Sequence, residues 1–174
     1  MMERNGLLQL AGQDVTIVGP DIEVGQQAPE FTLRAKDWTV VDVLKATEGK
    51  VRVIAAVPSL NTSVCDAEAK RFNEEAASLN PDIAIVTVST DLPYTLSNWC
   101  AASGVERVTT YSDAYDTNFG QSYGALIKDR RILRRAVFVV DRKGKVTYAD
   151  YMKALGDQPD YAAVLEAAKA ALAS

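Results

Sequence analysis

The sequence predicts an α/β fold with a mixed central sheet flanked by helices. Three observations favour this class. Apolar, strand-sized runs alternate with helical patterns through the middle of the chain. The run 136–140 then passes through a polar turn into 146–149 as a hairpin, and an amphipathic helix is expected at about 159–172. Alternation favours parallel pairing and the hairpin adds an antiparallel strand, so the sheet should be mixed.

The amino-terminal region is expected to decorate this core. Leu8–Leu10 and Asp14–Val18 flank Ala11-Gly12-Gln13, a pattern typical of a small β-hairpin, and Phe31–Leu33 follows as a short strand. The chain shows no internal repeat and no flexible linker. We therefore expect one domain over residues 1–174, with a hairpin extension over about 1–24.

The central segment is the most informative. Val51 to Val57 is a short apolar, β-branched run, and a helical pattern follows from about Thr62 to Leu79. Five residues of that helix recur at offsets of 4, 3, 4 and 3 and share one face: Cys65, Ala69, Phe72, Ala76 and Leu79. Cys65 therefore begins an inward stripe near the start of the helix.

A second strand and helix follow the first pair. Ile83 to Ser89 is expected as a strand and Pro93 to Ser103 as a helix, with Asp91 as its cap and Gly104 beyond its end. Cys100 lies on this second helix, beside a tryptophan. A short strand at 108–111 and a short helix at 118–123 complete the pattern.

Composition excludes several classes of function. The chain has 174 residues with a net charge of −4 and no long block of one sign, so no nucleic-acid surface is expected. No apolar run exceeds strand length and the amino terminus lacks a signal core, so neither membrane spanning nor secretion is expected. A soluble, cytoplasmic protein is the expectation.

Two cysteines and no histidine limit the chemistry further. They are too few for a disulfide scaffold or an all-cysteine zinc site, and the usual nitrogen ligands are missing. No metal and no other cofactor is therefore expected. Because Ser-His and Cys-His dyads are also excluded, any nucleophile must be activated by something other than imidazole.

The sharpest local feature is the pattern Pro-x-x-x-Thr-x-x-Cys formed by Pro58, Thr62 and Cys65, at the expected change from strand to helix. Backbone amides at a helix start carry partial positive charge, so a thiol in the first turn is stabilised as a thiolate. Thr62 can cap the helix or direct its hydroxyl at the sulfur or a bound oxygen. The competing interpretation is structural: Cys65 is a buried core residue, Thr62 only a cap and Pro58 only a strand terminator.

At this point the sequence resembles the thiol peroxidases, the atypical 2-Cys branch of the peroxiredoxin family, over nearly the whole chain. Beside the Pro58–Cys65 motif, the resemblance includes a second cysteine 35 residues after the first and five other segments: 28–33, 89–93, 123–124, 135–141 and 159–161. It implies a thioredoxin-like fold and a peroxidase that reduces hydrogen peroxide and organic hydroperoxides to water and alcohols.

The resemblance also implies a role for each site residue. Cys65 is expected to be the peroxidatic cysteine and Cys100 the resolving cysteine of an intramolecular disulfide, with Thr62 and Arg135 as polar partners and Pro58 as a shield. Strand alternation favours Arg135 over the neighbouring Arg134, because it places Arg135 on the same face as Val137 and Val139. A surface charge is the competing interpretation of Arg135, and a core residue that of Cys100.

The expected partners are a hydroperoxide substrate, thioredoxin or a similar dithiol as reductant, and a second copy in a homodimer. Asn61 and Ser63 stand where the family usually has aspartate and proline or glycine, and Met152 to Gln158 lacks the usual acidic residues. One alternative of another class stays open: a thioredoxin-like redox sensor or binding module with negligible turnover. A disulfide oxidoreductase would need Cys-x-x-Cys, which is absent.

Overall fold

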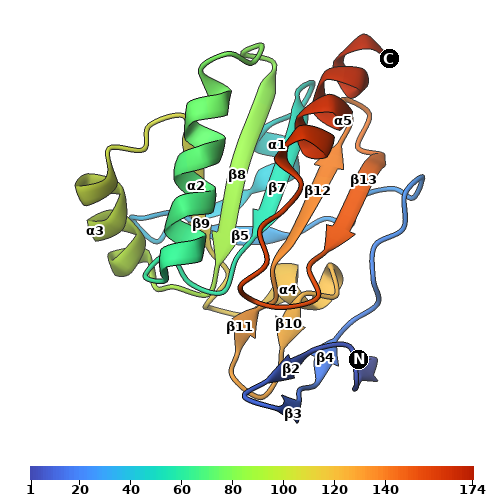
Figure 1. Cartoon of the computed structure of the whole chain (residues 1–174). Helices are drawn as coiled ribbons and strands as arrows, with labels where there is room; N and C mark the ends of the chain where they lie inside the picture. The colour runs from blue at the N-terminus through green and yellow to red at the C-terminus, as the bar shows by residue number, and fades with distance from the viewer.

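A computed structural model describes all residues 1–174, and its centre is a seven-stranded mixed sheet (Figure 1). The strand order is β13-β12-β7-β8-β9-β5-β6. The inner strands β7, β8 and β9 pair in parallel, and the outer pairings are antiparallel. The bounds are β5 Thr32–Arg34, β6 Val40–Asp42, β7 Val51–Ala56, β8 Ile83–Ser89, β9 Val108–Ser112, β12 Ala136–Val140 and β13 Val146–Tyr151.

Helices cover both faces of this sheet. Helices α2 (Ser63–Ala76) and α5 (Tyr161–Ala173) lie together on one face, and α3 (Pro93–Ser103) lies to the side of α2, against β9 (Figure 1). The short helices α1 (Val43–Ala46) and α4 (Asn118–Ser122) cover the other face. The predicted α/β class, with a mixed sheet between helices, is confirmed.

Alternation along the strands divides the core in two. On β7, Val53 and Ala55 face α2 and α5, whereas Ile54 and Ala56 face the side of α1 and α4. Every residue of β7 is buried, as expected of a parallel strand covered on both faces. Cys65 belongs to the α2/α5 side of the core, which positions it against the sheet.

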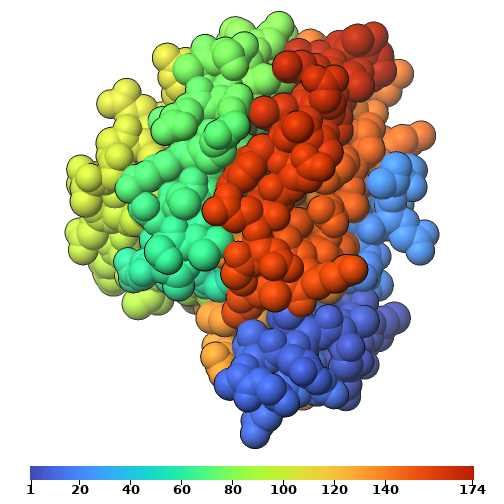
Figure 2. Space-filling model, viewed as in Figure 1, coloured from blue at the N-terminus to red at the C-terminus, as the bar shows by residue number.

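The amino-terminal region projects from one end of the molecule (Figure 2). The expected hairpin exists only as the two-residue strands β2 (Gln9–Leu10) and β3 (Gln13–Asp14). The expected second strand, Asp14–Val18, is divided, because its last two residues form β4 (Ile17–Val18), which pairs with strands outside the hairpin. Those strands are β1 (Glu3–Arg4) and β10 (Leu126–Ile127), and β11 (Ile132–Leu133) completes this second sheet.

Local signals predicted the central elements well, and the errors concern short ones. Strands β8 and β12 and helix α3 have the predicted bounds. The sequence patterns did not predict β1, β6, α1, β10 and β11, whose few residues carry no period. No helix is long and apolar enough to cross a bilayer.

Candidate active site

Cys65 lies at the third position of α2, immediately after the loop that leaves the central strand β7. Thr62 is the residue at which the helix begins, so Cys65 belongs to the first turn, where backbone amides lack helical partners. The Cys65 residue is fully buried. The thiol therefore lies inside the core, at the end of the helix that carries partial positive charge.

The sulfur of Cys65 accepts a hydrogen bond from Arg135, whose Nη2 lies at 3.2 Å. The same guanidinium forms an ion pair with Glu68 through its Nη1. Its Nε and Nη2 both donate to the carbonyl oxygen of Leu155, at 3.1 and 2.9 Å. Arg135 therefore contacts three groups at once, which the several donors of its forked guanidinium make possible.

Burial and charge oppose each other in this cluster. Burial raises the pKa of Glu68 to about 7, although the positive charge of Arg135 acts to lower it. Burial acts to lower the pKa of Arg135, but the charges of Glu68 and Cys65 outweigh this and raise it. Arg135 consequently stays a cation beside the sulfur.

The choice between the two adjacent arginines is settled by strand alternation. Arg135 shares the α2 side of the sheet with Val137 and Val139, as predicted. Arg134 points to the other side, where it pairs with Asp21 and lies over the ring of Tyr151 at 3.9 Å. The competing interpretation of Arg135 as a surface charge is wrong, because the residue is only 1% exposed.

The loop before α2 is fastened by Asp91. Its carboxylate accepts from Ser59 Oγ at 2.6 Å, from the Leu60 amide at 2.8 Å and from Ser89 Oγ at 2.8 Å. The predicted role of Asp91 as the cap of α3 is wrong: the capping residue is Leu92, without a side-chain bond. The carboxylate instead bonds two donors of the loop before α2 and one at the end of β8.

Thr62 and Pro58 frame the same loop. The Thr62 hydroxyl donates to the carbonyl of Ser59 at 2.8 Å, so it neither caps α2 nor reaches the sulfur in this conformation. Thr62 is exposed, whereas Pro58 is buried. Thr62 therefore lies at the surface beside the start of the helix, with its hydroxyl proton engaged by the loop.

Cys100 lies on α3 and has a different environment. Its sulfur is 3.2 Å from the Thr110 hydroxyl on β9, and the residue is half-buried. It lines a cavity of about 510 Å³ to which Cys65 does not contribute. Both cysteines are free thiols.

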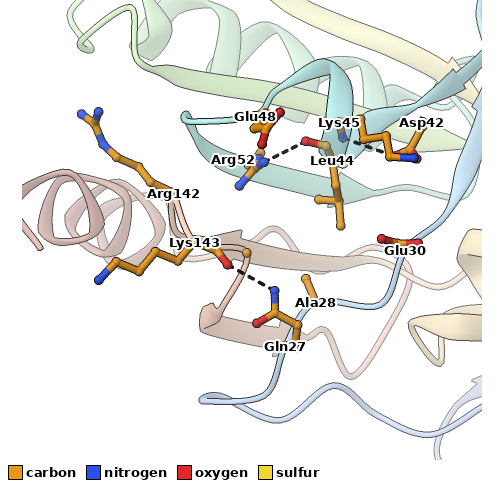
Figure 3. A pocket seen from close by; sticks show the side chains of 11 residues that line it. Gln27, Ala28, Glu30, Asp42, Leu44, Lys45, Glu48, Arg52, Arg142 and Lys143 are labelled. Carbon is orange, nitrogen blue, oxygen red and sulfur yellow. Dashed lines mark hydrogen bonds and ion pairs between the residues drawn. The ribbon is translucent and has the colours of Figure 1, made fainter.

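A larger cavity, of about 610 Å³, has neither cysteine in its lining, which Figure 3 draws. Two of its charged groups are already paired with protein partners. Arg52 donates to the carbonyls of Leu44 and Asp141 and to the Thr47 hydroxyl, and Lys45 pairs with Asp42. Neither cysteine lines this cavity, so it holds no thiol nucleophile.

The sequence did not predict the contributions of Glu68, Asp91 and Leu155 to the site. Glu68 carried a usable signal, because a residue three positions after Cys65 lies on the same side of a helix. Asp91 was noticed but given the wrong role. Leu155 contributes only its backbone carbonyl, so no side-chain signal could have marked it.

Comparison with known proteins shows the family of this chain. The Redoxin family model matches residues 23–165. Thiol peroxidase from Halalkalibacterium halodurans is 46% identical over 92% of this chain and 96% of that protein, and thiol peroxidase from Bacillus subtilis is 45% identical over 91% and 94%. The chain belongs to the Redoxin family and, within it, to the thiol peroxidases, a branch of the peroxiredoxins.

Solved structures support the fold in the same way. A peroxiredoxin-like protein from Aquifex aeolicus aligns with a TM-score of 0.84 at 35% identity and covers 94% of this chain and 96% of its own. Thiol peroxidase from Chromobacterium violaceum aligns with a TM-score of 0.83 at 16% identity, covering 95% and 97%, which concerns the fold alone. The predicted thioredoxin-like class is confirmed.

Proposed function

We propose that this chain is a thiol-dependent peroxidase that reduces hydrogen peroxide and organic hydroperoxides, with Cys65 as the peroxidatic residue. The observation that carries the proposal is the 3.2 Å contact between Arg135 and the Cys65 sulfur, in the first turn of a buried helix. A permanent cation and unpaired amides both favour the ionised form of a thiol. The membership of the thiol peroxidases supports the same activity.

The first step is attack of the Cys65 thiolate on one oxygen of ROOH. The O–O bond breaks, Cys65 becomes a sulfenic acid, and the other oxygen leaves as an alkoxide or hydroxide that takes a proton to give ROH or water. Negative charge moves onto the leaving oxygen, so donors fixed nearby lower the barrier. Arg135, the first amides of α2 and the Thr62 hydroxyl, once released from Ser59, can supply them. Because Cys65 is fully buried, access of the peroxide requires movement of the residues that cover it.

The second step is resolution by Cys100. Its thiol displaces water from the sulfenic acid and forms a Cys65–Cys100 disulfide. An external dithiol of the thioredoxin type then reduces this disulfide by thiol exchange. Such a cycle suits the cytoplasm, where protein thiols are kept reduced.

The proposed homodimer is supported by an exposed aromatic surface. Trp38 and Tyr94 contact each other edge to face at 5.6 Å between ring centroids, and Tyr94 is 65% exposed. Two aliphatic side chains are also about half exposed: Leu92 at 50% and Val40 at 53%. Exposed aromatic groups of this kind are enriched where two proteins meet.

The test is single-turnover oxidation of two cysteine variants, followed by stopped flow and mass spectrometry. Cys65→Ser should consume no peroxide, whereas Cys100→Ser should complete one turnover and leave a sulfenic acid that dimedone traps at Cys65. Equal loss of the first turnover in both variants would contradict the assignment. A redox sensor without an activated site, the alternative function, should react no faster than a free thiol.

A further inference from the structure

Helices α2 and α3 are joined by one side-chain hydrogen bond, and it lies beside both cysteines. The indole Nε1 of Trp99 donates to Asp66 Oδ1 at 2.9 Å. Asp66 directly follows Cys65, and Trp99 directly precedes Cys100. No other side-chain hydrogen bond or ion pair connects the two helices.

Both partners are committed to this contact. Trp99 is 9% exposed, and a nearly buried indole N–H needs an acceptor. The other oxygen of Asp66 pairs with Lys70 at 2.8 Å. The bonds from Lys70 and Trp99 both lower the pKa of Asp66, the former more strongly, so the acceptor is a carboxylate and the hydrogen bond is charge-assisted.

Disulfide formation changes the surroundings of both cysteines next to this contact. In the reduced protein the Cys65 sulfur is held by Arg135 and the Cys100 sulfur by Thr110, so the two sulfurs are directed at different partners. Cys65 is buried between α2 and the sheet, whereas Cys100 opens into a separate cavity. A disulfide joins the two sulfurs directly, so both must leave these partners, and the helix α3 that carries Cys100 also carries Trp99.

We propose that the Asp66–Trp99 hydrogen bond is a latch that holds the two helices in the reduced arrangement and sets the rate at which Cys100 reaches the oxidised Cys65. This inference rests on the proposed peroxidase function. Asp66 and Trp99 act as positioning residues, since neither touches the peroxide or a sulfur. The latch controls the partition of the Cys65 sulfenic acid between two reactions.

The two reactions differ in their second reactant. In one, the Cys100 thiol attacks the sulfenic sulfur, an S–S bond forms, and the S–O bond breaks with release of water. In the other, the sulfenate attacks a second ROOH, the O–O bond breaks, and Cys65 becomes a sulfinic acid while ROH leaves. A latch that opens slowly lengthens the life of the sulfenic acid and favours the second reaction.

The experiment is rapid-quench oxidation of the full chain with excess cumene hydroperoxide, with mass spectrometry of each sulfur species. In Trp99→Phe, which keeps the ring plane and removes the N–H, disulfide formation should be about tenfold faster and the sulfinic fraction correspondingly smaller. The oxidation of Cys65 in the preceding phase should stay within about twofold of the parent rate. Asp66→Ala should reproduce both results from the other side of the bond.

Matched variants separate the latch from a general loosening of α2. Lys70→Met removes the ion pair on the second carboxylate oxygen but leaves Trp99 bonded, so its disulfide phase should match the parent within about twofold. Unchanged or slower disulfide formation in both Trp99→Phe and Asp66→Ala overturns the latch, even when Cys65 oxidation is intact. Loss of the first phase in the unmodified chain would instead defeat the proposed function itself.

A fluorescence measurement gives an independent readout. The chain has two tryptophans, so a Trp38→Phe background excited at a wavelength that tyrosine does not absorb leaves Trp99 as the only emitting residue. Its emission should change in the disulfide phase and stay constant during the preceding oxidation of Cys65. Emission that stays constant through both phases contradicts the release of the Trp99 N–H.

Discussion

Arg135 and Glu68 form an ion pair in which each side chain is only 1% exposed, and the same guanidinium donates to the Cys65 sulfur. One cation therefore contacts two acidic groups in the core, the Glu68 carboxyl and the Cys65 thiol. The second carboxylate oxygen of Glu68 has no hydrogen-bond partner, so the carboxylate is only partly compensated. Burial of this kind favours the neutral acid, in agreement with a pKa of Glu68 near 7.

The stability of the protein should therefore depend on pH through Glu68. Its pKa rises from 4.5 in the unfolded chain to about 7 in the folded protein, so the folded state binds the extra proton between these values. The stabilisation is complete below about pH 4.5 and is lost as the pH rises through about 7. We expect the free energy of unfolding of Glu68→Gln, relative to the parent, to increase by about 1–3 kcal/mol between pH 5 and pH 8.

Urea denaturation at several pH values measures this difference. The parent chain is the reference, because the raised pKa of Asp113, also near 7 through burial, is common to both proteins and cancels. A difference between parent and variant that stays constant from pH 5 to pH 8 would show that Glu68 does not titrate in this range.

Arg135→Lys should keep a positive charge for Glu68 and still damage the site. A single ammonium cannot reach Cys65, Glu68 and the Leu155 carbonyl together, as the guanidinium does. We expect Cys65 oxidation by hydrogen peroxide and its alkylation by iodoacetamide at pH 7 both to slow by about 10–100-fold. Arg134→Lys is the matched control, and equal slowing in both variants would remove the special role of Arg135.

Asp91 should contribute to stability and to the geometry of the loop before α2. Asp91→Ala leaves the Leu60 amide and the hydroxyls of Ser59 and Ser89 without their common acceptor. The expected loss is about 3 kcal/mol in the free energy of unfolding, with a slower first oxidation step. Asp91→Asn retains one carbonyl acceptor and should lose about half as much. A loss below about 0.5 kcal/mol in Asp91→Ala would argue that the loop is held by other contacts.

Thr62 should matter for catalysis more than for folding. Thr62 is exposed and its hydroxyl bonds only to the Ser59 carbonyl oxygen, so Thr62→Val should destabilise the fold by less than about 1.5 kcal/mol. If the hydroxyl turns to the peroxide during reaction, oxidation in Thr62→Val should slow by about 10–100-fold, whereas Thr62→Ser should stay within a few-fold. Stopped-flow oxidation compares the two, and equal rates in Val and Ser variants would exclude the hydroxyl from the reaction.

Much of this architecture could be predicted from local patterns. The continuous apolar run of β7 and the spacing of Cys65, Ala69 and Phe72 in α2 record burial directly, because buried faces repeat with the period of the element. The position of Cys65 in a first helical turn follows from the same signals. Short pieces such as β10 and β11 could not be predicted, since two residues carry no period and are paired only by the tertiary fold.

The sequence by itself determined that a thiol stands where a strand becomes a helix, and strand alternation singled out Arg135. Only the tertiary structure decided that Glu68 pairs with Arg135, that Asp91 holds the loop before α2, and that Trp99 bonds to Asp66. The physical reason is that a charged or polar side chain shows its type in sequence but not its partner. Partners 67 residues apart, as Arg135 and Glu68 are, meet only when the sheet and helices pack.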